Sequence, residues 1–271
     1  MSAAGTVRHL PFPAMTALSL RQAPASGGHG SAGRVRISAH RGAVSGRGGV
    51  ADLEAFDRAS RSGVDLVEFD VRTTRDGELV ALHDSCLADG RRVRSLTLAE
   101  LRAAIGVVVP TVEEVLRSVA PYAIAHIDLK EVGIERRVAE LAIELVGLEG
   151  FFLTTLEDAS VAVLKLAFPH VRVGLSLGRD VRGMSPLDAL WVRASEIFPG
   201  RRIRRCGPDF VAAAYLLARL RLLRFCTRRG VEIWVWTVDR ERAIRRVLRD
   251  RRVAVLVTNR AARTVALRGH R

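Results

Sequence analysis

The chain has 271 residues, of which 48% are hydrophobic and 27% are charged, and its formal net charge is +14. This balance is typical of a packed globular protein, and it excludes a wholly disordered or fibrous chain. The longest apolar stretches, such as residues 210–217, are well short of the roughly 18 residues that a membrane span requires.

The beginning of the chain is rich in glycine, alanine, serine and proline, which predicts a flexible N-terminal segment over residues 1–34. An apolar stretch at residues 10–20 is interrupted by two prolines, so it makes a poor signal peptide. The sequence has three cysteines, which is an odd number, and no two of them form a CxxC motif. A framework of disulfides is therefore not expected, which favours a reducing compartment. We therefore expect a cytoplasmic protein, with secretion as the alternative.

After residue 34, short β-branched runs alternate with longer amphipathic stretches. We predict strands over residues 35–39, 65–71, 79–82, 122–129, 151–155, 171–176, 209–212, 231–238 and 253–257. The helices predicted between them cover residues 51–61, 97–104, 111–120, 134–146, 159–167, 185–197, 215–229 and 240–249. Two of these helices begin with capping boxes, Thr97 with Glu100 and Thr111 with Glu114. Eight such units in about 235 residues favour an α/β fold of one domain, a TIM (β/α)8 barrel over residues 35–265, rather than an open doubly wound sheet.

In such a barrel, functional side chains lie at the carboxyl ends of the strands, where this sequence has histidines, acids and cations. The first predicted strand runs into His40 and Arg41, and the short third strand runs into His83. Two pairs of charged residues lie at alternate positions of the predicted strands: Glu68 with Asp70, and Asp128 with Lys130. Alternate positions of a strand share one face, so the two side chains of each pair lie on the same side. One such pair is a weak signal, but their joint occurrence at successive strand ends indicates one site.

These residue types favour chemistry on a phosphate ester. Three acids on the inner side of a barrel are costly to bury without a cation, and their oxygen ligands suit one hard divalent metal ion, Mg²⁺ or Ca²⁺, better than zinc. Arg41 and Lys130 supply positive charge for an anionic substrate. His40 and His83 are suited to acid–base catalysis near neutral pH.

Eight short motifs follow one another along the chain: HRG at 40–42, GVDLVEFDV at 63–71, TRDG at 74–77, VALHD at 80–84, VPTVEEV at 109–115, DLK at 128–130, WTVD at 236–239 and TN at 258–259. Taken in this order, they resemble the glycerophosphodiester phosphodiesterase family across residues 35–260. The resemblance implies a TIM barrel that hydrolyses glycerophosphodiesters to sn-glycerol 3-phosphate and an alcohol with one divalent metal ion.

The resemblance also implies a role for each matching residue. His40 and His83 are similar to the family's general acid and base, and the implied metal ligands are Glu68, Asp70 and Asp128. The implied substrate contacts are Arg41 and Lys130 to the phosphate and Trp236 as a wall of the pocket. The implied mechanism is attack on phosphorus by the neighbouring glycerol hydroxyl, protonation of the leaving alkoxide, and hydrolysis of a cyclic phosphate in a second step.

Two positions depart from the family pattern. The family's Glu-Asn-Thr motif downstream of HRG is missing, because Val50 stands where its glutamate is expected, and we expect Asp52 to be the N-cap of the next helix rather than a replacement. Asp128 stands where the family has glutamate, which keeps the charge but shortens the side chain. Sphingomyelinase D-like phospholipases share both departures, so action on intact lipids of the sphingomyelinase D or lysophospholipase D type stays open.

The arginine content leaves a second class of function open, a catalytically impaired barrel that binds anionic lipid or nucleic acid. Both histidines and the acid and lysine pairs are intact, which favours the enzyme. Aromatic residues are only 5%, and no nucleic-acid-binding motif accompanies the arginine runs, which argues against nucleic acid. We therefore expect a small glycerophosphodiester as the partner, with peripheral contact to anionic lipid left open. His126 and Trp234 are predicted to lie in the core.

Overall fold

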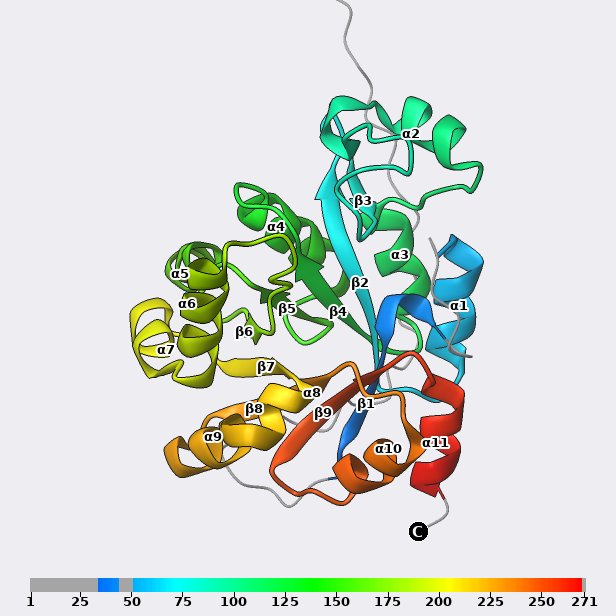
Figure 1. The fold of residues 1–271 in the computed structure, drawn as a ribbon. Coiled ribbons are helices and arrows are strands. Elements are labelled where there is room, and N and C mark those ends of the chain that lie inside the picture. The colour runs from blue at the N-terminus through cyan, green and yellow to red at the C-terminus, as the bar shows by residue number, and fades with distance from the viewer. Residues whose placement is uncertain (1–33, 44–50, 270–271) are drawn as a thin grey trace, which may run out of the picture.

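Among residues 34–43 and 51–269, which this computed structural model describes, eight parallel strands close into a barrel (Figure 1). β1 (Arg36–Ala39) pairs with β2 on one side and with β9 on the other, and this double pairing closes the ring. The strands that follow β1 round the ring are β2 (Leu66–Thr73), β4 (Ile124–Leu129), β5 (Phe151–Thr155), β6 (Val173–Leu177), β7 (Phe210–Ala214), β8 (Glu232–Trp236) and β9 (Val253–Thr258). The predicted TIM barrel is confirmed.

Helices cover the outside of the barrel between successive strands (Figure 1). In chain order they are α1 (Leu53–Arg61), α3 (Val112–Val119), α4 (Glu135–Val146), α5 (Asp158–Ala167), α6 (Pro186–Ile197), α7 (Gly200–Cys206), α8 (Tyr215–Leu217), α9 (Leu223–Arg229), α10 (Glu241–Leu248) and α11 (Ala261–Gly269). A π-helical turn, η3 (Ala218–Leu222), joins α8 to α9 into one helical stretch. No helix of the described residues is long and apolar enough to cross a membrane.

A small excursion rises above the carboxyl end of β2 (Figure 1). It consists of β3 (Leu79–Ala81), antiparallel to the end of β2, the short helix η2 (Val93–Ser95) and α2 (Leu98–Ile105). Both predicted capping boxes are present, at Thr97 before α2 and at Thr111 before α3. The excursion buries its own small core, which includes Val80, Val93 and Leu101. It therefore holds the segment that carries His83 above the mouth of the barrel.

Aromatic side chains fill the lower part of the barrel interior. Trp234 on β8 is fully buried, as predicted, and its ring stacks on Phe210 at a centroid distance of 4.1 Å. Gly174 on β6 makes room for this pair, because a Cβ there would lie 2.2 Å from the Phe210 ring. Large side chains therefore fill the interior at this level. The acids and histidines predicted for the site lie at the carboxyl end.

Most predicted elements lie where the sequence places them, with small differences at the ends. β4 begins at Ile124 rather than at residue 122, because the chain first completes a turn after α3. Two helices, α7 and α11, were not predicted. Four of the seven residues of α7 are arginines, which read as a charged surface run, but Arg202 is held in the fold by Asp158 at 2.7 Å. The predicted N-terminal segment, residues 1–34, lies almost entirely outside the described residues and stays a prediction.

Candidate active site

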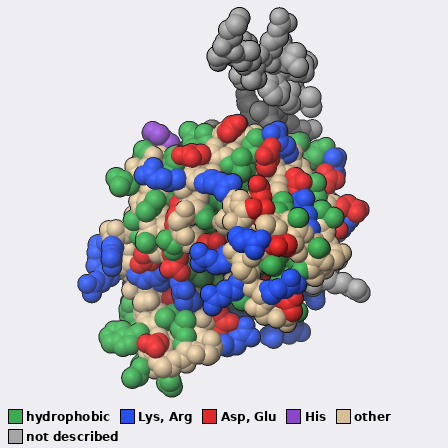
Figure 2. Space-filling model, turned by 90° about the horizontal axis from the view of Figure 1, so that it is seen from above, with side chains coloured by type: hydrophobic (Ala, Val, Ile, Leu, Met, Phe, Trp, Pro, Cys, Tyr) green, Lys and Arg blue, Asp and Glu red, His purple; other side chains and the backbone are tan. Residues whose placement is uncertain are grey.

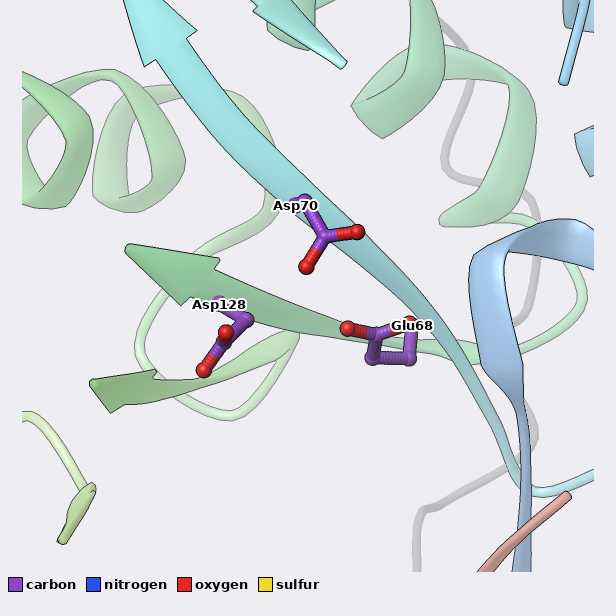
Figure 3. Close-up of side chains that lie close together, drawn as sticks. All are labelled: Glu68, Asp70 and Asp128. Atoms are coloured by element: carbon purple, nitrogen blue, oxygen red, sulfur yellow. The ribbon is translucent and has the colours of Figure 1, made fainter. Parts of the chain in front are cut away.

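Three carboxylates meet at the carboxyl end of the barrel. Glu68 and Asp70 lie two residues apart on β2, and Asp128 on β4 stands directly beside Asp70 in the strand register. All three side chains are buried, and each offers one oxygen that lies within 4.8 Å of the others. Figure 3 shows the three carboxylates turned into the same space in front of the two strands. The barrel therefore brings together the three predicted metal ligands.

The donor set fits a divalent cation. Among the described residues, the three carboxylates pair with two cationic side chains, Arg41 and Lys130, so the formal charge of this described cluster is negative. Neither oxygen of Asp70 accepts a hydrogen bond from the described residues, although Arg41 Nε and Lys130 Nζ approach these oxygens to 2.9 Å as ion pairs. Burial, together with the neighbouring Asp70 and Asp128, raises the pKa of Glu68 well above its usual range. A hard cation bound to these oxygens would relieve this repulsion.

Lys130 lies between two of these carboxylates. Its ammonium group pairs with Asp70 and with Asp128. Burial alone would lower the pKa of Lys130, but the two carboxylates outweigh burial and raise it. The side chain therefore remains charged at neutral pH and holds the acids close to one another in the absence of metal.

The HRG motif forms a tight turn, η1 (His40–Gly42), directly after β1. Arg41 has φ 52° and ψ 40°, a left-handed conformation that a non-glycine residue seldom adopts, and its backbone N–H donates to Glu68 Oε2 at 2.8 Å. Gly42 is also left-handed, and a Cβ there would lie 2.9 Å from the Phe56 ring. The turn therefore requires glycine at its third position, and it aims two successive polar side chains into the barrel mouth.

A chain of hydrogen bonds orients His40. Asp239 can only accept, so the Asn259 Nδ2 amide donates to it at 2.7 Å, and this leaves Asn259 Oδ1 to accept from His40 Nδ1 at 2.7 Å. In the neutral ring the proton therefore lies on Nδ1, and the free Nε2 lone pair is 4.0 Å from Glu68 Oε2. Burial lowers the pKa of His40, which favours this neutral form.

His83 has a different environment. Its Nδ1 donates to the carboxylate of Asp84 at 2.7 Å, and 41% of its side chain is exposed. Arg72 Nε donates to the backbone carbonyl of His83 at 2.7 Å and so ties this segment to β2. The two predicted catalytic histidines therefore lie at the same end of the barrel, one partly buried beside Glu68 and the other at the rim.

Trp236 lies at the end of β8, at the barrel mouth, and is partly buried. Its indole Nε1 has no hydrogen-bond partner among the described residues. Gly178, after β6, makes room for the ring, because a Cβ there would lie 3.1 Å from it. This position is compatible with the predicted role of Trp236 as a wall of the pocket.

The departure from the family at Val50 lies outside the described residues. Asp52 is described, and its side chain accepts from the backbone N–H of Ala55 at 2.8 Å, which makes it the N-cap of α1 as predicted. It is therefore engaged in starting a helix.

Some site residues were not found from the sequence. Asn259 and Asp239 were noted only as parts of motifs, without a role. Thr154 on β5, which donates to Asp128 Oδ1 at 2.5 Å, belongs to none of the motifs. Only the register of neighbouring strands brings it to the site, with Thr154 beside Asp128.

The surface of the protein carries many basic side chains. Figure 2 shows the molecule of Figure 1 from above, the side on which the end of β2 and α2 lie. Lysine and arginine side chains gather over the middle of this face in Figure 2. A basic surface of this kind attracts anions to the protein.

Comparisons with known proteins identify the family and similar folds. The model of the glycerophosphoryl diester phosphodiesterase family matches residues 40–263. The chain is similar to a glycerophosphodiester phosphodiesterase of Caldanaerobacter subterraneus, with 25% identity over 217 residues that cover 73% of this chain and 83% of the relative. In fold it resembles a glycerophosphodiester phosphodiesterase of Parabacteroides distasonis, with a TM-score of 0.68, 21% identity and coverage of 90% and 99% of the two chains. It also resembles a phosphodiesterase of Oleispira antarctica solved with the product sn-glycerol-3-phosphate, with a TM-score of 0.66, 16% identity and coverage of 86% and 96%.

Proposed function

The chain belongs to the glycerophosphoryl diester phosphodiesterase family, and from this premise we propose that it releases sn-glycerol 3-phosphate from glycerophosphodiesters by histidine acid–base catalysis with one divalent cation. The observation that carries the proposal is the meeting of three buried carboxylates with His40 at one end of the barrel, below a second histidine at the rim. The enzyme is a phosphodiesterase, and a glycerophosphodiester is its small-molecule partner.

The residues that would hold the cation are Glu68, Asp70 and Asp128, and Mg²⁺ or Ca²⁺ is the expected ion. When bound, it supplies Lewis-acid polarisation of the phosphoryl group and offsets negative charge that develops there. Arg41 approaches Asp70 through Nε, and its two terminal guanidinium nitrogens have no hydrogen-bond partner among the described residues. We assign these nitrogens to the phosphate, since a guanidinium matches two phosphate oxygens well.

We assign the role of general base to His40. Its free Nε2 takes the proton of the glycerol hydroxyl next to the phosphate, and that oxygen attacks phosphorus to form a cyclic phosphate. The bond from phosphorus to the alcohol oxygen breaks, and His83 at the exposed rim gives its proton to the leaving alkoxide. Water then opens the cyclic phosphate with the two histidines in reversed roles. Each proton transfer of this kind contributes typically about 10²–10⁴-fold to a rate.

The test is release of glycerol 3-phosphate from glycerophosphocholine and glycerophosphoethanolamine, with and without EDTA. The expected result is release that stops in EDTA, returns on addition of Mg²⁺ or Ca²⁺, and is lost in His83→Ala. No release from either compound by the metal-loaded protein would contradict the proposal.

One observation favours a second candidate, action on intact lipids. α6 exposes three large apolar side chains on one face, with Leu187, Leu190 and Trp191 each 65–74% exposed, next to the carboxyl end of β6. An exposed apolar helix face with tryptophan on a basic protein is suited to contact with a lipid surface. A lysophosphatidylcholine arm in the same assay, with vesicles that contain anionic lipid, tests this candidate. The control is Leu166→Ala, which removes a leucine of α5 that is 85% exposed.

A further inference from the structure

Four buried side chains form a continuous line of hydrogen bonds across the barrel interior. Ser38 Oγ on β1 lies 3.2 Å from His126 Nδ1 on β4, and His126 Nε2 lies 3.0 Å from Thr154 Oγ1 on β5. Thr154 Oγ1 in turn lies 2.5 Å from Asp128 Oδ1. The line therefore begins at a serine of the first strand and ends on one of the proposed metal ligands.

Each hydrogen bond in the line has a defined direction. A carboxylate oxygen only accepts, so the single hydroxyl proton of Thr154 is donated to Asp128. Thr154 Oγ1 must then accept from His126, which puts the ring proton of His126 on Nε2. The unprotonated Nδ1 is left to accept from the hydroxyl of Ser38. Every polar atom of the imidazole is thereby satisfied.

The surroundings of His126 keep it in this form. The side chain is buried and meets the Trp234 ring edge to face at a centroid distance of 5.0 Å, so it has little freedom to rotate. Both ring nitrogens have a partner, and Nδ1 can accept from Ser38 only while it carries no proton, so these hydrogen bonds hold the neutral ring. A neutral ring with one fixed proton is a directional donor rather than a charge.

We propose that His126 and Thr154 are positioning residues that set the orientation of Asp128 toward the cation. This inference rests on the proposed function, because it assumes that Asp128 is a ligand. Thr154 holds one carboxylate oxygen of Asp128 and Lys130 holds the other, so the plane of the carboxylate is fixed. A carboxylate has about four lone-pair sites, so two remain for a metal ion. Partners of this outer kind typically change metal affinity by about 10–100-fold when they are removed.

The test is titration of the full chain with Mg²⁺ and, separately, with Ca²⁺ by calorimetry. Thr154→Val keeps the shape and removes the hydroxyl, and we expect its metal affinity to fall by about 10–100-fold. Thr154→Ser keeps the hydroxyl and should retain wild-type affinity. His126→Phe keeps the packing against Trp234 and should weaken binding less than Thr154→Val, because the threonine is still present but is no longer oriented.

The matched control is Thr155→Val on the same strand. Thr155 is equally buried, but its hydroxyl accepts from the backbone N–H of Glu157 and lies outside the line. The Thr155→Val variant should lower the free energy of unfolding and leave metal affinity unchanged. If Thr154→Val is folded and binds both ions like the wild type, or if Thr155→Val weakens binding equally, the inference is overturned. If the wild type itself binds neither ion, the proposed metal site fails, and the inference fails with it.

Discussion

Lys130→Met tests the charge balance of the cluster, because it removes one of the two cations that pair with the acids among the described residues and keeps most of the side-chain length. Lys130 is paired with Asp70 at 2.9 Å and with Asp128, and both acids are buried. Removing one partner of a buried ion pair typically costs about 3–5 kcal/mol. For a domain of this size, each kcal/mol corresponds to about 2–4 °C, so the melting temperature in EDTA should fall by about 6–20 °C.

The direction in which the stabilising effect of Lys130 changes with pH is also defined. Because the acids raise the pKa of Lys130 in the fold, its stabilising effect is complete below the pKa of about 10.4 in the unfolded chain and is lost only as pH rises further. Melting at pH 7 therefore measures the whole contribution of the ammonium group.

Metal should rescue this variant. With all three acids ionised, the formal charge of the cluster changes from −1 to −2 when Lys130 is removed, so a divalent cation should bind more tightly. A ligand at 100 times its Kd stabilises a protein by about 2.7 kcal/mol, and at a fixed concentration of Mg²⁺ the rise in melting temperature should be larger in the variant than in the wild type.

The chain contains one other lysine, which provides the control. Lys165 on α5 pairs with Asp209 at 2.9 Å, away from the three acids. Lys165→Met should lower the melting temperature without any gain in the effect of Mg²⁺. The reasoning is refuted if Lys130→Met melts like the wild type in EDTA, or if Mg²⁺ stabilises it less than it stabilises the wild type.

Three further outcomes are expected. Asn259→Asp places a carboxylate against Asp239 and should lower kcat by on the order of 10²-fold. Adding Asp239→Asn should restore kcat, because the donor and the acceptor of this hydrogen bond are then exchanged. If the double variant does not recover, the proposed orientation of His40 is contradicted. The free energy of unfolding in EDTA should fall as the pH drops below 6.5, because the unfolded chain protonates His40 and His126, whose pKa values are lowered in the fold. Urea titrations at pH 7 and pH 5 should show that His126→Phe reduces this slope by about 1.4 kcal/mol per pH unit, the contribution of one histidine that stays neutral in the fold. A thiol reagent should modify the exposed Cys86 rapidly in the native protein and the other two only on unfolding, because burial raises their pKa to about 11 in Cys206 and about 12 in Cys226.

The sequence predicted the strands of the barrel because each is a short apolar run between helices with clear starts. It did not predict α7, whose arginines have no helical apolar pattern and whose Arg202 finds Asp158 only in the folded chain. Local patterns thus predict elements well where the residues that stabilise an element lie within it.

At the site, too, local patterns predicted some residues, and contacts between distant parts of the chain determine the others. His40, Glu68 and Lys130 were predicted because strand alternation and motifs point to them directly. The partner that orients His40 lies 219 residues further along the chain, and the link from Ser38 through His126 to Thr154 joins three different strands. Such contacts depend on the closure and register of the barrel. His126 was predicted as a core residue, which is correct for its burial, but its hydrogen bonds extend to the site.

The most direct test of the central claim is a comparison of His40→Ala and His83→Ala in the metal-loaded enzyme. With saturating glycerophosphocholine, each variant should lose about 10²–10⁴-fold in kcat, because each removes one proton transfer. Their affinity for Mg²⁺ should remain that of the wild type, because neither residue is a proposed ligand. Wild-type kcat in either folded, metal-bound variant would contradict the account of two histidines that act on one phosphate.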